Sequence, residues 1–360
     1  MGSPAVSALM QVALRRRLVD AERAVQLAGE LADCANPAAL STRLAVHHSP
    51  ESIVLRELLP GGRLPGTGAY RPLACLGQGR TASTWLGVGV DGAKALVLKF
   101  YHPSRIKPGA EVELFVRDVA PLIGKEHRYL VGYLDAFAAD DGRAVLVQQY
   151  VAGSDLAARS VIKGAMPEAK ALTVLRQASK GLIELDHLGV VHGMLHPGNV
   201  LIDSDHRARL TDYGLAFGRT LQSVRQGWDA RSLMLHAWAA PETFLAPPRM
   251  LNASDIYAFG CIAFWLLGGK PPFPGTPEQQ ALQHAQAARP DVRAHTPSVS
   301  EITAKTLLKA MQVEPVQRYA RAVELTASLQ RNLERLHGAT PGTAGPEGTP
   351  RPTDNPLTAD

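Results

Sequence analysis

Apolar residues recur at helical spacing over residues 5–34 and again over Pro50–Leu59. Within the first of these segments Asp20 can act as an N-cap, so we expect two helices there rather than one. The stretch PGGRLPGTG at residues 60–68 ends this region, because proline fixes φ and glycine leaves the backbone free. We therefore expect a helical extension over residues 1–65.

Short apolar runs typical of strands follow this boundary. From about residue 167 to about residue 330 the pattern is helical, so strands precede helices along the chain. The predicted strands are Tyr70–Leu76, Ala82–Val88, Ala93–Tyr101 and Ala144–Tyr150.

The most apolar segment is Ile256–Leu267, and its 12 residues are too few to span a bilayer. We expect it to form a helix in the core. The chain does not open with a basic start followed by an apolar stretch, so no signal peptide is expected. Residues 337–360 are rich in Pro, Gly and Thr with almost no apolar side chains, and we expect them to form a disordered tail.

Of the 360 residues, 46% are apolar and 20% are charged, a globular composition that excludes wholesale disorder. The net charge is +5, and we interpret the densest basic run, Arg15–Arg17, as a solvated helix face rather than a nucleic-acid patch. Cys34, Cys75 and Cys261 are too far apart for a disulfide framework or a zinc site. We expect a soluble, cytoplasmic protein that binds neither nucleic acid nor membrane.

A glycine-rich turn between the first two predicted strands is the first candidate site. Gly77 and Gly79 let backbone amides approach phosphate oxygens, although a tight hairpin explains both glycines equally well. Further on, Lys99 ends an apolar run, where a lysine is costly unless it pairs with an anion. From these residues alone, a phosphate site and a solvated edge lysine both remain open.

With the motifs that follow, the chain resembles a eukaryotic-type protein kinase domain over about residues 69–336. The resemblance implies an α+β, bilobal fold, with a β-rich N-lobe over about 69–150 and a helical C-lobe over about 151–336, in a domain of residues 66–336. The motifs that agree in order and spacing, beyond the glycine-rich turn and the strand lysine, are His192–Asn199 (HGMLHPGN) for the catalytic loop H-R-D-L-x-x-x-N, Asp212–Gly214 (DYG) for D-F-G, Ala240–Glu242 for A-P-E, Asp255–Gly260 for the helix F motif, and Arg318 for the arginine that pairs with Glu242.

The resemblance also implies that the domain binds ATP and Mg²⁺. In this family an acid on helix C pairs with the strand lysine, and here the shorter Asp118 stands at that position, so the pair needs a closer helix or a water. The implied nucleotide-binding residues are Gly77, Gly79, Ala82 in place of the third glycine, Lys99, Asp118, the hinge residues Gln149 and Val151, and Asn199 and Asp212, of which the last two are the implied metal ligands.

The catalytic loop departs from the family at three positions. Met194 stands where the family has the aspartate that accepts the substrate proton, and a thioether cannot serve as a base at neutral pH. His196 replaces the lysine near the γ-phosphate, and Gly193 replaces the arginine that clamps a phosphorylated activation loop. These losses, beside an intact nucleotide-binding set, favour a pseudokinase. Such a protein would be a scaffold or allosteric regulator in signalling, with protein partners bound through the N-terminal helices or the C-lobe.

Two alternatives remain open. The first is a weakly active serine/threonine protein kinase with His196 as a substitute base, because phosphoryl transfer depends mainly on positioning and electrostatics. The second is a small-molecule phosphotransferase, because HGMLHPGN also resembles the H-G-D-L-H-P-G-N loop of aminoglycoside and choline kinases. Those enzymes lack the A-P-E and helix F motifs.

Two further pairs of residues invite a chemical interpretation. His192 and His196 are four apart, as in a helical metal site, but Pro197 disfavours helix there and we interpret His192 as a packed core residue. We interpret Glu242 and Arg318 as a structural ion pair.

Overall fold

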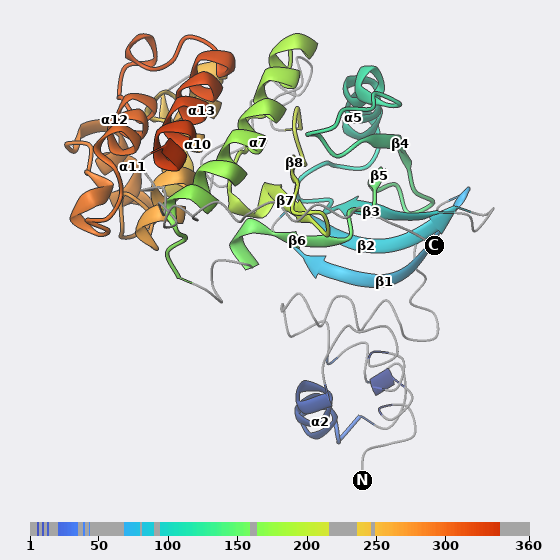
Figure 1. Ribbon diagram of the computed structural model, residues 1–360. Helices are drawn as coiled ribbons and strands as arrows, with labels where there is room; N and C mark the ends of the chain where they lie inside the picture. Colours follow the sequence, from blue (N-terminus) through green and yellow to red (C-terminus); the bar gives the residue numbers. More distant parts are fainter. Residues whose placement is uncertain are drawn as a thin grey trace, which may run out of the picture.

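In the computed structural model the chain folds into a β-rich lobe and a helical lobe (Figure 1). The predicted helix over Pro50–Leu59, the cap Asp20, the run Arg15–Arg17 and the tail after residue 338 lie outside the described residues. The structure describes residues 21–34, 68–79, 81–89, 94–158, 164–215, 236–245 and 249–338, with a few isolated positions before residue 44.

The first lobe is an antiparallel sheet of five strands in the order β1-β2-β3-β5-β4. The four predicted strands are confirmed as β1, β2, β3 and β5, whereas β4 was not predicted. The strands are β1 Tyr70–Gln78, β2 Ala82–Gly89, β3 Ala95–Tyr101, β4 Tyr133–Ala138 and β5 Ala144–Gln149.

Strand β3 shows how the sheet presents its two faces. Leu96, Leu98 and Phe100 belong to an apolar cluster on one face. Side chains alternate along a strand, so Val97 and Lys99 lie on the opposite face, where both line a cavity. Because β3 lies between β2 and β5, the edge position considered for Lys99 is excluded.

Helix α5 (Ala110–Val119) packs near β4 and β5 and carries Asp118. Val112, Phe115 and Val119 are buried, and their spacing of three and four places them on one helix face. The short 3₁₀ helix η1 (Ala120–Leu122) follows directly.

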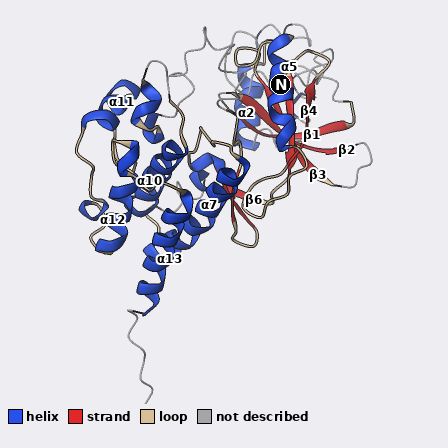
Figure 2. Cartoon of the chain, turned by 90° about the horizontal axis from the view of Figure 1, so that it is seen from above, coloured by secondary structure: helices blue, strands red, loops and turns tan. Residues whose placement is uncertain are grey.

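The second lobe is built around α10 (Asn252–Gly268), which confirms the predicted core helix. Every residue from Ser254 to Leu267 is buried except Trp265. Seen from above, the helices of this lobe lie apart from the strands of the first (Figure 2). The other helices of the lobe are α7 Glu168–Leu188, α11 Pro277–Gln286, α12 Glu301–Ala310 and α13 Ala322–Gly338, with the 3₁₀ helices η2 Pro197–Asn199, η4 His236–Trp238, η5 Pro241–Phe244, η6 Val292–Ala294 and η7 Pro315–Gln317.

The expectation of helix from residue 167 to about residue 330 is wrong between Gly189 and Leu251. The described residues there form strands, 3₁₀ turns and loops. A second, three-stranded sheet joins β6 (Gly153–Asp155), β7 (Val200–Asp203) and β8 (Ala208–Leu210). Strands of three or four residues are too short to produce a clear alternating pattern in the sequence.

At the N-terminal end, α2 (Ala21–Glu30) lies within the segment that was expected to be helical. Leu27 and Leu31 pack with Leu9 and Met10 in a small apolar cluster that is separate from the main core. In the described part of the chain, none of the helices has the length and apolar character needed to cross a membrane.

A buried ion pair fastens η5 to the segment before α13. Arg318 Nη1 and Nη2 donate to the two carboxylate oxygens of Glu242, each at 2.7 Å. The Arg318 side chain is fully buried and also donates to three main-chain carbonyls, and Ser254 Oγ donates to Glu242 at 2.6 Å. Burial and these hydrogen bonds account for the pair, and its interpretation as a structural ion pair is confirmed.

Candidate nucleotide and phosphotransfer site

A cavity of about 530 Å³ lies between the two lobes. The cavity face of the first sheet contributes Val97, Thr84 and Gln148, and the second sheet contributes Asp155 and Leu201. The predicted nucleotide-binding residues that line this cavity are Gly77, Gly79, Lys99, Gln149 and Val151.

The glycine-rich turn has the hairpin geometry that the sequence allowed. Gly79 N–H donates to the carbonyl of Ala82 at 2.9 Å, and a Cβ at Gly79 would lie 3.1 Å from that oxygen. Gly79 and the buried Ala82 therefore close a tight hairpin. A Cβ at Gly77 would meet no atom within 4 Å, so this part of the turn leaves its backbone open beside the cavity.

Lys99 and Asp212 bring the two lobes into direct contact. The Lys99 ammonium lies 2.5 Å from both carboxylate oxygens of Asp212, which follows β8. Burial raises the pKa of Asp212, but the charge and hydrogen bonds of Lys99, helped by Gln148, more than offset this effect. As a result the pKa of Asp212 lies below its ordinary value, so the carboxylate is ionised at neutral pH.

Asp118 does not take the position that was expected beside the strand lysine. In the described part of the chain, the ion pair of Lys99 is formed with Asp212 and not with Asp118. Asp118 lies half-buried on α5. The aspartate side chain is one methylene shorter than the glutamate of the family.

Gln148 also contacts the Asp212 carboxylate, a role that was not predicted from the sequence. Its Nε2 donates to Asp212 Oδ1 at 3.2 Å, and its Oε1 accepts from Thr211 Oγ1 at 3.5 Å. Asp212 has φ 60°, a backbone conformation that non-glycine residues seldom adopt. The available signal in the sequence was the polar residue Gln148 directly after the apolar run Val145–Val147.

The residue after Asp212 is tied to the first lobe by a pair of tyrosines. The rings of Tyr133 and Tyr213 stack with centroids 4.4 Å apart and an interplanar angle of 5°. Tyr213 OH donates to the carbonyl of Val131 at 3.0 Å, and Tyr133 OH donates to the carbonyl of Tyr213 at 2.8 Å. These contacts restrain the turn that presents Asp212.

We expect Tyr213→Phe to lower the free energy of unfolding by about 1–3 kcal/mol, because the stack is kept while the buried carbonyl of Val131 loses its donor. Urea denaturation followed by fluorescence measures this change. Tyr129→Phe, at a tyrosine that is only half-buried, serves as the control. An equal loss of stability in the two variants would show that the Tyr213 hydroxyl has no special role.

The catalytic-loop segment brings Met194, His196 and Asn199 together around η2. Asn199 is buried, and its Nδ2 donates to the carbonyl of Met194 at 2.9 Å. The amide oxygen of Asn199 is therefore the side-chain atom that could bind a metal ion. Among the described residues no three His, Cys, Asp or Glu side chains gather, so Asp212 and Asn199 would supply only part of a magnesium shell. Phosphates and waters usually complete such shells.

The hydrogen bonding of His196 argues against its use as a base. Its Nδ1 accepts from Gly198 N–H at 3.1 Å, so the neutral ring carries its proton on Nε2. Burial lowers the pKa of His196 to about 4, so the ring is neutral at pH 7. In this state His196 can donate a hydrogen bond from Nε2 but cannot accept a proton there.

Helix α10 supports the catalytic loop through hydrogen bonds of Asp255. Asp255 accepts from His192 N–H at 2.7 Å and from Gly193 N–H at 2.9 Å, and Gly193 has φ 77°. Burial raises the pKa of Asp255 to about 7 although the two amide donors lower it. His192 is fully buried, and burial lowers its pKa to about 4, which confirms it as a packed core residue.

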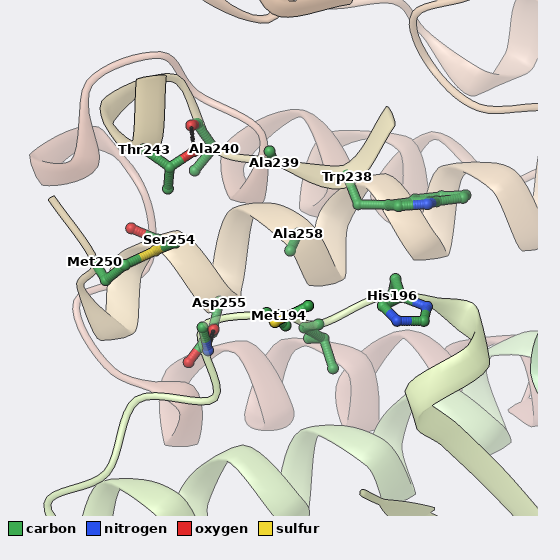
Figure 3. A pocket seen from close by; sticks show the side chains of 12 residues that line it. Met194, His196, Trp238, Ala239, Ala240, Thr243, Met250, Ser254, Asp255 and Ala258 are labelled. Atoms are coloured by element: carbon green, nitrogen blue, oxygen red, sulfur yellow. Dashed lines mark hydrogen bonds between the residues drawn. The ribbon is translucent and has the colours of Figure 1, made fainter. Parts of the chain in front are cut away.

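A small pocket of about 40 Å³ lies between the loop and α10 (Figure 3). Met194 and His196 line one side of it, and Trp238 and Ala240 line the other. Met194 therefore presents a thioether beside this pocket, at the position where the family has a carboxylate. The one carboxylate in the lining belongs to Asp255, which is engaged with the loop amides.

Residues 70–328 match the family described as protein kinase domain. The serine/threonine-protein kinase pkn2 of Myxococcus xanthus is 29% identical over 318 residues, which cover 84% of this chain and 36% of that protein. PkaB of Streptomyces coelicolor, also a serine/threonine-protein kinase, is 29% identical over 281 residues, covering 76% and 65%. The DNA damage-responsive serine/threonine-protein kinase RqkA of Deinococcus radiodurans is 30% identical over 306 residues, covering 81% and 45%.

The chain thus spans between about one third and two thirds of the length of these curated relatives. Among solved structures, the PknI kinase domain of Mycobacterium tuberculosis aligns with a TM-score of 0.60 and 20% identity, covering 74% of this chain and 96% of that one. This likeness shows the fold and confirms the expected bilobal architecture.

Proposed function

Because the chain belongs to the protein kinase family, we propose that it binds ATP with Mg²⁺ and transfers phosphate slowly to hydroxyl groups of proteins. The supporting observation is the convergence of Lys99 and Asp212. They come from different lobes, meet at 2.5 Å beside the cavity, and are the cation and the carboxylate that a metal–nucleotide complex requires.

The residues present fit such a complex. Lys99 would hold phosphate oxygens, and Asp212 with Asn199 would hold the metal ion. Backbone groups of Gln149 and Val151, which line the cavity, would meet the adenine. Bound Mg²⁺ would neutralise part of the phosphate charge.

Slow transfer follows from the catalytic loop. Met194 supplies no proton acceptor, and the Nε2–H of His196 offers only a donor for a phosphate oxygen. A positioned base contributes about 10²–10⁴ to the rate, so transfer without one is slow while positioning and electrostatics still act. The relatives reported above are all named as serine/threonine-protein kinases, which favours a kinase of low activity over the pseudokinase expected from the sequence.

The pseudokinase remains the second candidate, and Met194 is the observation that favours it. In that case the domain would bind nucleotide and act as a scaffold or regulator, with protein partners bound through the N-terminal helices or the C-lobe. A small-molecule phosphotransferase is disfavoured, because the buried Glu242–Arg318 pair and the core helix α10 are features of the protein kinase motifs.

Calorimetry with ATP, with and without Mg²⁺, tests nucleotide binding. We expect Lys99→Met and Asp212→Asn each to weaken binding of the magnesium complex at least tenfold, because each removes one charge of the converging pair. ATP at 100 times its dissociation constant should stabilise the wild type by about 2.7 kcal/mol. Lys305→Met, which removes an exposed lysine paired with Glu301, is the control and should bind ATP normally.

Unchanged nucleotide affinity in both site variants would show that any nucleotide binds elsewhere and would refute the proposed site. A phosphotransfer assay with radiolabelled ATP then separates the two candidates. Labelling of protein substrates by the wild type that is lost in Asp212→Asn supports the slow kinase. Nucleotide binding without any labelling supports the pseudokinase.

A further inference from the structure

We propose that Gln148 is a positioning residue that orients the Asp212 carboxylate for metal binding. This inference rests on the proposed function, because it concerns the same site. Gln148 ends the buried part of β5, is 2% exposed and lines the cavity between the lobes.

The orientation of the Gln148 amide is fixed by chemistry. A carboxylate that is ionised can only accept, so the amide nitrogen must face Asp212 and the amide oxygen must face Thr211. The structure has this arrangement, with Nε2 at 3.2 Å from Asp212 Oδ1 and Oε1 at 3.5 Å from Thr211 Oγ1. Thr211 is itself buried, as Gln148 is, whereas the Asp212 side chain is 24% exposed.

Gln148 is the neutral partner of Asp212, whereas Lys99 is the charged one. In the proposed complex Lys99 turns to phosphate oxygens, and Asp212 then loses its ion-pair partner. Gln148 is anchored on β5 and does not depend on the nucleotide, so it continues to hold Oδ1. This leaves Oδ2 for the metal ion and keeps the carboxylate in one rotamer.

Other roles for this glutamine fit the contacts less well. Both ends of its amide are engaged by Thr211 and Asp212, so it is not directed at a purine base. The next residue, Gln149, points its amide oxygen toward Gly132 N at 3.4 Å, as expected from side-chain alternation along a strand. Gln148 is therefore the residue of this pair that faces the metal-binding carboxylate.

The test compares Gln148→Met with the wild type in the full chain, since methionine has a similar length and no amide. Calorimetry gives the ATP affinity in excess Mg²⁺ and again in EDTA. We expect the gain in affinity that Mg²⁺ provides to fall about tenfold in Gln148→Met, while the affinity in EDTA changes less than twofold. Thr211→Val should reduce the gain by a smaller factor, because it removes only the hydroxyl that orients the amide.

Two controls separate positioning from a loss of packing. Gln330→Met removes a half-buried amide on α13, where Gln330 accepts from Arg176, and should leave both affinities unchanged. In the background of Asp212→Asn, Gln148→Met should have no further effect on the Mg²⁺ gain. An equal loss of affinity with and without Mg²⁺, or an unchanged Mg²⁺ gain, would overturn the proposal and make Gln148 part of the cavity wall only.

Failure of the proposed function gives a different result. If the wild type binds no nucleotide in either condition, the nucleotide site is refuted. The probe is then Mn²⁺ alone, and its binding is measured by water proton relaxation. Weaker Mn²⁺ binding in Gln148→Met than in the wild type would still support positioning of Asp212. Equal or absent Mn²⁺ binding in the two proteins would overturn it.

Discussion

Met194→Asp is expected to raise phosphotransfer at least tenfold over the wild type, and Met194→Asp with His196→Lys is expected to raise it further. The first change returns a proton acceptor to the loop that holds Asn199, and the second replaces a neutral ring by a fixed positive charge. A tenfold rise corresponds to only about 1.4 kcal/mol of barrier, so even partial restoration is measurable. Autophosphorylation and labelling of a generic protein substrate with radiolabelled ATP report the rates.

Met194→Asn is the matched control, because asparagine has the shape of aspartate but is not a base. Its activity should stay at the wild-type level. If the wild type is already as fast as the double variant, Met194 is not a defect. If all variants bind ATP and none transfers phosphate, the block lies in the placement of Asp118 or of the glycine-rich turn, and the scaffold becomes the better account.

Arg318→Met is expected to lower the free energy of unfolding by about 3–5 kcal/mol, the largest stability effect that we predict. The substitution leaves the Glu242 carboxylate buried without its cation and also removes the donors to three main-chain carbonyls. Equilibrium denaturation in urea measures the change.

Arg293→Met, which breaks a partly exposed pair with Asp291, is the control and should leave the unfolding midpoint nearly unchanged. The double variant Arg318→Met with Glu242→Leu should recover part of the loss, because no buried charge then remains. A small effect of Arg318→Met, comparable with that of Arg293→Met, would contradict the structural role of the pair.

Local signals in the sequence were sufficient for much of the fold. The strands β1, β2, β3 and β5 and the core helix α10 are long enough for their apolar pattern to identify them. Strand β4 was missed because Asp135 and the flanking residues interrupt its pattern, and β7 and β8 were missed because they are so short. Motif spacing supplied the family that the patterns alone could not.

The candidate site was predictable as a set of residues but not as a set of contacts. Lys99 and Asp212 were both expected to bind the metal–nucleotide complex, and the structure pairs them directly. The partner expected for Lys99 was Asp118, and a difference of one methylene cannot be weighed without knowing where α5 lies. Gln148 was missed because its role depends on Thr211 and Asp212, which are more than 60 residues away along the chain.

The ion pair between Lys99 and Asp212 has a consequence for how the domain would sense its ligands. A phosphate group alone would draw Lys99 away and leave Asp212 uncompensated, and a metal ion alone would do the same to Lys99. When the phosphate group and the metal ion bind together, Lys99 pairs with the phosphate and Asp212 pairs with the metal ion. Neither charge is then left without a partner. Nucleotide and metal should therefore bind with positive cooperativity, each raising the affinity for the other by the same factor. A domain built in this way responds to the coincidence of two ligands, and it does so whether or not its loop completes the transfer.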